Sequence, residues 1–234
     1  MTTPDYEARL ERSLGEIRGR IARAAERNGR EADQVTLVAV TKAHPLAAVQ
    51  AALEYDLTDL GENRVDDLVD KAATMADDRV RWHMIGHLQR RVAPRLVGVA
   101  GLVHSIDSLR LGQRLSNAAE EAGHRQHVLV QVNTSGEHSK GGLPGSIGED
   151  LRGILSLSGL EVRGLMTMAP FTDDEHVVRG TFRALRELRD ELRQFDGFEG
   201  NELSMGMTND FEIAIEEGST MIRLGTALFG GRTA

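Results

Sequence analysis

The chain of 234 residues contains no cysteine. Disulfides, thiolate nucleophiles and cysteine metal sites are therefore excluded, and the composition fits a reducing compartment. The longest apolar runs, such as residues 97–103, are too short to cross a bilayer. The first residues also lack the basic start and apolar stretch of a secretory signal. We therefore expect a cytoplasmic protein that is not bound to a membrane.

Positive charge is also scarce, because 36 acidic side chains outnumber 28 basic ones and the net charge is −8. Nucleic acids and anionic membranes both favour clustered positive charge, so neither is an expected partner. Arg90 and Arg91 form a local basic pair, which we interpret first as a solvated surface. The eight histidines show no His-x-x-x-His spacing on a predicted helix, so no metal site is predicted.

The first segment has the pattern of an amphipathic helix. Thr3 is placed to cap it, Pro4 suits its first turn, and Asp5 complements the positive end of its dipole. Asn28-Gly29 marks its end. Apolar residues recur at spacings of three and four, which places them on one face: Tyr6, Leu10, Leu14, Ile17 and Ile21. This pattern predicts one helix before the first strand.

Beyond this helix, short apolar runs rich in β-branched residues alternate with longer amphipathic stretches. We expect strands over Val35–Thr41, Leu57–Gly61, Arg81–Gly86, Gly101–Ile106, His127–Asn133, Glu161–Met168, Glu202–Gly206 and Met221–Gly225. Eight strands alternating with helices in a chain of this length predict an α/β fold, a (β/α)8 TIM-type barrel, with residues 1–234 as one domain. An open doubly wound sheet is the competing arrangement.

Helical periodicity is clear in two of the connecting segments. The two stripes are Leu111, Leu115, Ala119 and Ala122, and Val178, Phe182, Leu185, Leu188 and Leu192. The second stripe is preceded by Thr172-Asp-Asp-Glu175, which has the spacing of a capping box. Helices are least clearly indicated after the third and fifth strands, because Pro94, Pro144 and several glycines interrupt those segments.

Lys42 stands where the first predicted strand ends and a polar loop begins. Chemistry on a TIM barrel takes place at the carboxyl ends of the strands, so we expect this side chain at the functional rim. Desolvation there disfavours the ammonium form, and a neutral amine can form a Schiff base with a carbonyl compound. Polar residues such as Asn63, His87 and Asn133 follow other strands. The pattern indicates polar groups converging on one rim, although an ordinary strand-end lysine remains the alternative.

Two glycine-containing loops follow the last two predicted strands, at residues 205–209 and 225–227. Barrels often bind phosphate at these loops, where glycine admits an anion close to backbone N–H groups and hydroxyls add donors. A helix starting near Thr208 would aim its positive end at the same site, and Asp210 and Glu212 would then face outward. Without a ligand, the same residues are turn and cap residues.

Arg223 interrupts an apolar run in the last predicted strand, so a central strand carries a buried or rim-facing cation. Two interpretations stay open at this point. The guanidinium pairs with a buried acid inside the barrel, or it faces a group of a bound ligand.

Short motifs run in order over nearly the whole chain: 38–42 (VAVTK), 61–63 (GEN), 82–89 (WHMIGHLQ), 104–108 (HSIDS), 139–141 (SKG), 164–168 (GLMTM), 203–208 (LSMGMT) and 218–230 (GSTMIRLGTALFG). Together they resemble the pyridoxal phosphate homeostasis protein family. The resemblance implies a barrel like the N-terminal domain of alanine racemase, with pyridoxal 5'-phosphate (PLP) bound covalently.

The resemblance also implies roles for individual residues. Lys42 would hold PLP as a Schiff base, and Asn63 would lie beside the cofactor. Arg223 would donate to the ring nitrogen and keep it unprotonated, which limits carbanion chemistry. The phosphate would be held by Ser204, Thr208, Gly225 and Thr226. Lys140 matches a second family lysine suspected in cofactor handling, with a solvated loop lysine as the alternative.

Four places in the chain depart from the usual family pattern. Thr41 and Thr208 stand where serine is usual, which keeps the hydroxyl. Asp66-Asp67 replaces Gln-Glu after the second strand, and Arg90-Arg91-Val92 replaces Ser-Asn-Lys after the third. The last change puts any role of that family lysine in doubt and leaves the cofactor-anchoring residues untouched.

The family is thought to buffer and deliver PLP and to influence vitamin B6 and amino-acid balance, without an established catalytic turnover. The implied partners are therefore PLP and the apo-forms of PLP enzymes, and we expect a monomer. An amino-acid racemase is the main alternative, but a two-base racemase needs acid–base groups on both faces of the carbon. The chain ends just past the eighth strand, and neither Tyr6 nor Tyr55 lies at a predicted strand end. The possible bases are His83, His87 and His104, although a histidine near a strand end is more often structural than catalytic. A Schiff-base aldolase acting on a sugar phosphate is the third hypothesis.

Overall fold

The computed structural model describes residues 1–137, 141–195 and 198–231. The strands in these ranges are β1 (Thr36–Val40), β2 (Asp59–Glu62), β3 (Arg81–Met84), β4 (Leu102–Ile106), β5 (Gln126–Asn133), β6 (Leu143–Pro144), β7 (Leu160–Met166), β8 (Glu202–Ser204) and β9 (Met221–Leu224). The helices are α1 (Thr3–Arg27), α2 (Leu46–Glu54), α3 (Val65–Met75), α4 (Leu109–Glu121), α5 (Glu149–Leu155), α6 (Glu175–Leu192), α7 (Phe211–Glu216) and α8 (Thr226–Phe229). Two 3-10 turns, η1 (Ala32–Gln34) and η2 (Ala93–Leu96), complete the described elements.

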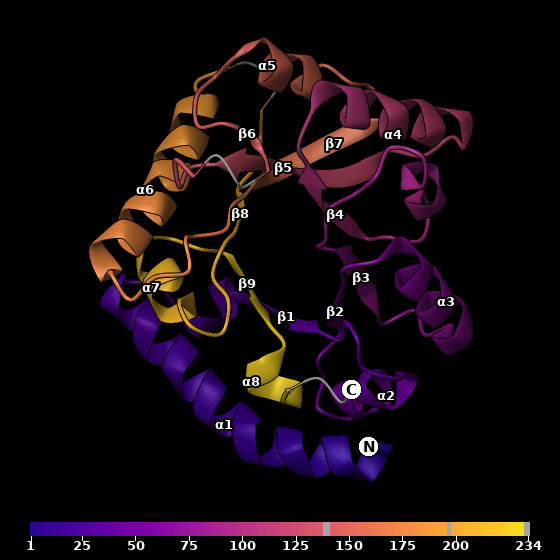
Figure 1. The fold of residues 1–234 in the computed structure, drawn as a ribbon, viewed down its shortest axis with the longest axis vertical. Coiled ribbons are helices and arrows are strands. Elements are labelled where there is room, and N and C mark those ends of the chain that lie inside the picture. Colours follow the sequence, from indigo (N-terminus) through magenta and orange to yellow (C-terminus); the bar gives the residue numbers. More distant parts are fainter. Residues whose placement is uncertain (138–140, 196–197, 232–234) are drawn as a thin grey trace.

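The strands form a closed parallel barrel (Figure 1). Their order is β4-β3-β2-β1-β9-β8-β7-β5, and β4 also pairs with β5, which closes the ring. The two-residue strand β6 pairs with β5 outside this ring. Helices surround the ring on the outside (Figure 1). The predicted TIM-type barrel is therefore confirmed, and the open doubly wound sheet is excluded.

The predicted N-terminal helix is α1, which lies along the outside of the barrel against α2, α7 and α8 (Figure 1). All five residues of the predicted apolar stripe are buried. The predicted cap is wrong by one position, because Thr2 is the N-cap and Thr3 is the first helical residue. The Thr2 N–H and hydroxyl both donate to the Asp5 carboxylate, at 2.7 and 2.9 Å. The helix ends at Arg27, and Asn28-Gly29 closes it as predicted.

Two other helix ends differ from the prediction. α6 is capped by Asp174 and not by Thr172, because the Asp174 carboxylate accepts the backbone N–H of His176 at 2.9 Å. α4 ends at Glu121, so Ala122 lies beyond the helix and is exposed. The α6 stripe was correct, and the α4 stripe was correct except for Ala122.

The helix expected near Thr208 starts later, at Phe211. The residues in between form a turn, in which the Phe211 N–H donates to the Met207 carbonyl at 2.9 Å. The segment after β3 contains only η2, and the one after β5 contains β6 and the short α5. These are the two segments where proline and glycine weakened the helical pattern.

Apolar side chains pack against both faces of the barrel sheet. The larger cluster lies between the strands and the surrounding helices. A smaller cluster lies inside the barrel and consists of Val38, Leu102, Leu129, Met166 and Met221. Arg223 pairs in register with Val38, so both side chains point to the same face of the sheet, the barrel interior.

Candidate active site at the barrel mouth

Lys42 lies in a tight turn directly after β1, at the carboxyl rim of the barrel. The turn is closed by a hydrogen bond from the His44 N–H to the Thr41 carbonyl at 3.0 Å, with Ala43 at a φ of 59°. His44 is buried, and its Nδ1 lies 3.0 Å from the Tyr6 hydroxyl of α1. Rings of Tyr6, His44 and Phe229 pack against one another. The half-buried Lys42 is therefore presented by a turn that α1 and α8 hold in place.

A second lysine, Lys71 of α3, lies close to the same turn. Its ammonium group is 2.6 Å from the Glu62 carboxylate and donates to the Thr41 carbonyl at 3.0 Å. The Thr41 hydroxyl donates to the same Glu62 oxygen at 2.6 Å. Glu62 is completely buried, so this ion pair is shielded from salt. The strand-end carboxylate next to Lys42 is thus neutralised by Lys71.

The strand register places the predicted rim residues side by side. Val40 pairs with Gly61, so the segments that lead to Lys42 and to Asn63 are neighbours. On the other side, a Cβ added at Gly225 would lie 3.2 Å from the Val40 carbonyl oxygen. The Arg223 N–H donates to the Gly206 carbonyl at 3.0 Å, which joins β9 to the loop after β8. The structure therefore brings Asn63, Lys42, Gly225, Thr226 and Thr208 to consecutive segments of one rim.

Arg223 is buried inside the barrel and contacts only neutral acceptors. One terminal nitrogen donates to the Ser204 hydroxyl oxygen at 2.5 Å, and the other donates to the Thr167 carbonyl at 3.1 Å. No carboxylate of the described residues lies within ion-pair distance of it, which removes the interpretation as half of a buried ion pair. Burial lowers the pKa of Arg223 to about 10, against a smaller opposing effect of Asp210. The guanidinium therefore remains a cation at neutral pH.

Ser204 begins a chain of hydrogen bonds that crosses the barrel interior. Its hydroxyl lies 2.9 Å from His104 Nδ1, and His104 Nε2 lies 2.9 Å from His83 Nδ1. His83 Nε2 lies 2.8 Å from the Asp59 carboxylate. Ser204, His104 and His83 are completely buried. The chain thus connects Arg223 to Asp59 through side chains of three other strands, β8, β4 and β3.

Burial lowers the pKa of both histidines, and that of His104 lies well below its usual 6.5. Neutral rings and a carboxylate at one end fix the direction of every hydrogen bond in the chain. Asp59 can only accept, so His83 carries its proton on Nε2 and accepts on Nδ1. His104 then donates from Nε2 and accepts on Nδ1, and the Ser204 hydroxyl donates to it. The remaining lone pairs of Ser204 are left to accept from Arg223.

The other predicted residues lie as follows. Thr208 is half-buried, and Thr226 is exposed at the rim. Ser204 differs from both, because its hydroxyl is enclosed in the barrel between His104 and Arg223. Glu212 faces away from the mouth, as expected, and pairs with Arg20 of α1 at 2.7 Å. Lys140, the other lysine suggested by the sequence, lies outside the described residues.

Sequence reasoning missed the participation of Lys71 and Thr167. Lys71 occupies an ordinary helix position, and Thr167 contributes a backbone carbonyl, so neither carries a signal in the sequence. His83 and His104 were noted only as possible bases or structural residues. The alternation of side chains along β3 and β4 indicates that both histidines face inward. The contact between them follows only from the pairing of those strands.

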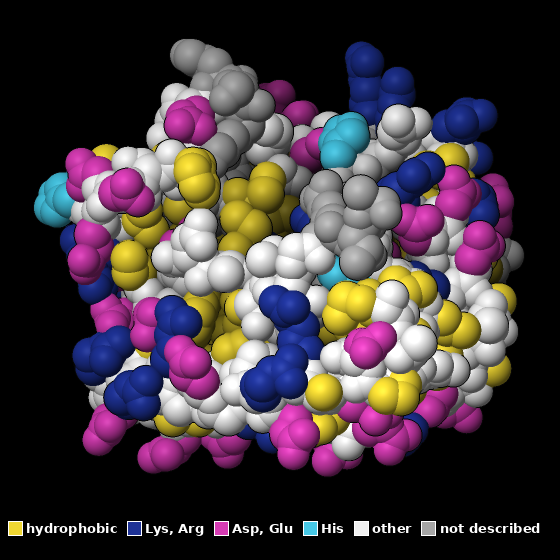
Figure 2. All heavy atoms as spheres, turned by 60° about the horizontal axis from the view of Figure 1, so that its bottom comes forward, with side chains coloured by type: hydrophobic (Ala, Val, Ile, Leu, Met, Phe, Trp, Pro, Cys, Tyr) yellow, Lys and Arg dark blue, Asp and Glu magenta, His cyan; other side chains and the backbone are white. Residues whose placement is uncertain are grey.

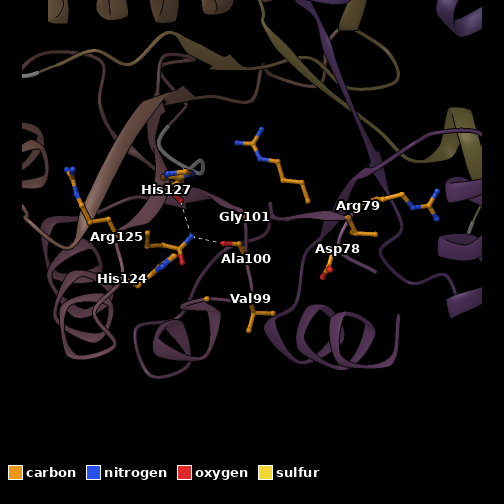
Figure 3. Close-up of a pocket in the computed structure, with 12 residues that line it drawn as sticks. Asp78, Arg79, Val99, Ala100, Gly101, His124, Arg125 and His127 are labelled. Carbon is orange, nitrogen blue, oxygen red and sulfur yellow. Dashed lines mark hydrogen bonds between the residues drawn. The ribbon is translucent and has the colours of Figure 1, made fainter. Parts of the chain in front are cut away.

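A distinct hollow lies away from this mouth. Figure 3 shows this hollow, which has a volume of about 350 Å³ and is lined by Arg79, Val99, Ala100, His124 and His127 among others. Arg81 and Gln126, which also line it, are the first residues of β3 and β5. This hollow therefore opens at the amino ends of the strands, opposite Lys42. Function on this fold resides at the carboxyl ends, so we place the candidate site at the mouth and not here.

Among the described residues, no helix is long and apolar enough to cross a membrane. Comparisons with known proteins assign the chain to a family. Residues 13–233 match the family model of the alanine racemase N-terminal domain. A relative from Aquifex aeolicus, named pyridoxal phosphate homeostasis protein, is 39% identical over 220 residues, which is 94% of this chain and 96% of the relative.

Solved structures agree with this assignment. An unknown protein from Bifidobacterium adolescentis superposes with a TM-score of 0.88 at 35% identity, covering 96% of each chain. PipY from Synechococcus elongatus, with PLP bound, gives a TM-score of 0.77 at 33% identity, covering 88% of this chain and 100% of its own. The motifs, the closed barrel and these relatives agree, and the chain belongs to the pyridoxal phosphate homeostasis protein family, built on the alanine racemase N-terminal domain.

Proposed function

We propose that this protein binds PLP at the barrel mouth, attached covalently to Lys42, and that it holds the cofactor and passes it on to other proteins. The observation that carries the proposal is the environment of Arg223. A buried guanidinium that rests on a hydroxyl and a carbonyl is costly, because neutral acceptors offset its desolvation only in part. A ligand with an acceptor atom at the mouth would compensate for that cost.

Bound PLP would supply an aldehyde that condenses with an amine and a pyridine ring whose nitrogen can accept a hydrogen bond. Arg223 suits the second feature, because it stays protonated at neutral pH and can only donate. A ring nitrogen facing it must therefore accept and remain unprotonated. Such a ring is a weak electron sink, which favours holding the cofactor over carbanion chemistry.

Lys42 suits the aldehyde. It is half-buried in a turn at the rim, and the adjacent strand-end carboxylate is already paired with Lys71. Partial burial disfavours the charged form of an amine and so favours its attack on a carbonyl. Asn63 follows the neighbouring strand and would lie beside the ring.

The phosphate would be held by the last two loops, through Thr208, Gly225 and Thr226. Their hydroxyls and backbone N–H groups lie on segments joined by the hydrogen bond from Arg223 to Gly206. Ser204 remains a predicted phosphate ligand, but its enclosed hydroxyl supports a role in orienting Arg223 instead. Thr226 is exposed, so cofactor held here would stay accessible to a receiving protein. The names of the relatives and the PLP-bound PipY structure support this function.

Borohydride trapping tests the proposal. The protein incubated with PLP, reduced and digested should carry a pyridoxyl group on Lys42, detected by peptide mass spectrometry. Lys42→Ala should abolish the label. Lys71→Arg is the matched control, because it removes a neighbouring lysine yet keeps a cation for Glu62, and it should retain full labelling of Lys42.

Labelling at another lysine would refute the assignment of Lys42. If the protein showed no affinity for PLP and instead formed a reducible adduct with a sugar phosphate, the aldolase hypothesis would replace ours. Because the chain matches the alanine racemase domain, an amino-acid racemase is the enzymatic alternative to test. Incubation of the PLP-loaded protein with L-alanine, followed by chiral chromatography, should show no D-alanine above a protein-free PLP control, and sustained turnover would favour the racemase.

A further inference from the structure

A second hollow, of about 440 Å³, lies on the outer surface between the β3–η2 loop and α4. Its lining, which we call the arginine hollow, consists of Arg90, Arg91, Arg110, Gln113, Arg114 and Asn117. The four residues from α4 form two pairs four apart, Arg110 with Arg114 and Gln113 with Asn117, so they share one helix face. Figure 2 shows several Lys and Arg side chains at the upper right of its view, with others at its lower left, and α4 lies on the right of the ring in Figure 1.

The four guanidinium groups of this hollow have no hydrogen bond or ion pair with any of the described residues. Many arginines elsewhere on the surface have a carboxylate partner. Arg27, Arg79, Arg163 and Arg179, for example, each lie within 2.8 Å of a carboxylate. These four arginines are distinctive because they gather around one hollow, in a chain whose acids outnumber its bases.

The local electrostatics of the arginine hollow are unfavourable without a ligand. Arg110 lies in the first turn of α4, where the helix dipole favours acids, and this turn contains no acidic residue. Arg110 and Arg114 are four residues apart, a spacing at which like charges destabilise a helix. Arg90 and Arg91 add two further positive charges across the hollow. Charges placed where they destabilise the helix, with no compensating contact in the fold, are typical of binding sites.

The loop that presents Arg90 and Arg91 is anchored at both ends. Leu88 and Ala93 are buried on either side of the pair. The N–H groups of Val92 and Ala93 both donate to the Gln89 carbonyl, at 3.1 and 3.2 Å. The two arginines therefore project from a fixed turn, which lowers the entropic cost of ordering them around a ligand.

We propose that the arginine hollow is a binding site for a small molecule with a chain of phosphate groups. A guanidinium pairs with phosphate through two parallel hydrogen bonds. Four guanidinium groups around one hollow therefore fit a ligand that carries several adjacent phosphate groups. The lining is made of long polar side chains from one helix and one loop, so recognition depends on charge and hydrogen bonding. A volume of this size is within the range of small-molecule sites. The net charge of −8 disfavours a nucleic acid as the ligand.

This site is separate from the proposed PLP site. The arginine hollow is formed by segments that follow β3 and β4, whereas the proposed phosphate loops follow β8 and β9. Both lie toward the carboxyl ends of the strands but belong to different parts of the ring. The proposal stands whether or not the protein binds PLP.

Isothermal titration calorimetry with inorganic tripolyphosphate tests the proposal on the whole chain. We expect one site, with an affinity that falls as the salt concentration rises. The double variants R90Q/R91Q and R110Q/R114Q should each bind about tenfold more weakly or worse, because each removes charge-assisted hydrogen bonds. Orthophosphate should bind more weakly than tripolyphosphate at equal salt.

A matched control separates a local site from general charge. R12Q/R23Q removes the same charge from two exposed arginines of α1 and should change the affinity less than about twofold, since their charges are screened at that distance. R110Q/R114Q should also unfold at the same or a higher temperature than the parent, because it relieves like-charge repulsion in α4. That result would exclude misfolding as the cause of lost binding.

Three results would overturn the proposal. Tripolyphosphate gives no heat of binding at millimolar concentration, or the α1 control loses as much affinity as the hollow variants. The third is competition, in which saturation of the protein with PLP displaces tripolyphosphate in a one-to-one ratio, placing the anion at the mouth. Binding of an acidic protein that depends on the four arginines, without binding of tripolyphosphate, would likewise replace this proposal with a protein interface.

Discussion

His83 Nδ1 and His104 Nε2 lie 2.9 Å apart in the barrel interior, and the proton between them belongs to His104. This assignment follows from the Asp59 carboxylate at one end of the chain, which can only accept, and Arg223 at the other, which can only donate. Burial lowers the pKa of both histidines and so favours neutral rings, and with neutral rings the Asp59 carboxylate requires hydrogen on Nε2 of each. The pair therefore holds Ser204 in the orientation that receives the Arg223 guanidinium.

The tautomers of the two rings are directly measurable. Nitrogen-15 NMR at neutral pH should show both His83 and His104 protonated on Nε2. Ser204→Ala removes the donor to His104 Nδ1 and the acceptor for Arg223, and should lower the free energy of unfolding by about 1–3 kcal/mol. Ser204→Thr keeps the hydroxyl and should retain the His104 tautomer. A spectrum with Nδ1–H tautomers in the parent would contradict the derived direction of the chain.

Replacement of Arg223 separates binding from stability. Arg223→Met preserves much of the side-chain volume and removes a buried cation that lacks a carboxylate partner. The free energy of unfolding without cofactor should stay within about 1 kcal/mol of the parent or rise, because a desolvation cost is removed. Affinity for PLP should fall about tenfold or more through loss of a charge-assisted hydrogen bond.

Arg223→Lys is the control for charge alone, since an ammonium group cannot reproduce the planar fork that reaches both Ser204 and Thr167. It should also bind PLP less tightly than the parent, as measured by absorbance titration. A loss of several kcal/mol of stability in Arg223→Met, with unchanged PLP affinity, would show that Arg223 serves the fold alone.

Stability should depend on pH through the two buried histidines. Their pKa values are lowered by burial, so the native state binds fewer protons than the unfolded chain, in which histidine titrates near 6.5. The free energy of unfolding should therefore be highest above pH 6.5 and fall as the pH drops below it. Each histidine contributes a slope of at most about 1.4 kcal/mol per pH unit.

Urea unfolding at pH 7.5, 6.5 and 5.5 measures this slope, and His104→Gln should reduce it. Nearby, Glu202 acts in the opposite direction, because burial raises its pKa and its protonation at low pH favours the native state. Asp59 and Arg81 also face the pair. The difference between the parent and His104→Gln isolates the histidine contribution, and an equal slope in both would contradict it.

Gly206 should be required by the loop that follows β8. Its φ is 98°, and a Cβ there would lie 2.6 Å from the Ala214 side chain. Gly206→Ala should lower the free energy of unfolding by about 1–3 kcal/mol and weaken PLP binding, because backbone strain adds to the clash. Gly180, inside α6 with open space around it, is the matched control, and Gly180→Ala should raise stability by about 0.5–1 kcal/mol. Equal effects at the two positions, measured by chemical denaturation, would contradict this assignment.

The alternation of strands and helices was readable from the sequence, because burial against helices on one side and the barrel interior on the other leaves short β-branched runs. The same logic placed Lys42 and Arg223 at or near strand ends, since rim residues follow directly from the boundaries of the strands. The boundaries themselves shifted at Thr2, Asp174 and Phe211, where one or two local hydrogen bonds decide the end of a helix. The family resemblance supplied the residue roles that periodicity could not.

The partners of these residues were decided by the tertiary structure. Arg223 of β9, Ser204 of β8, His104 of β4 and His83 of β3 are spread over 140 positions of the chain, and their inward orientation alone does not tell which of them touch. Closure of the barrel brings them within hydrogen-bond distance. The Lys71–Glu62 pair has the same origin, since the packing of α3 against β2 selects it. Sequence periodicity encodes which face of an element is buried, whereas the identity of the neighbour across the interior depends on strand order, register and closure.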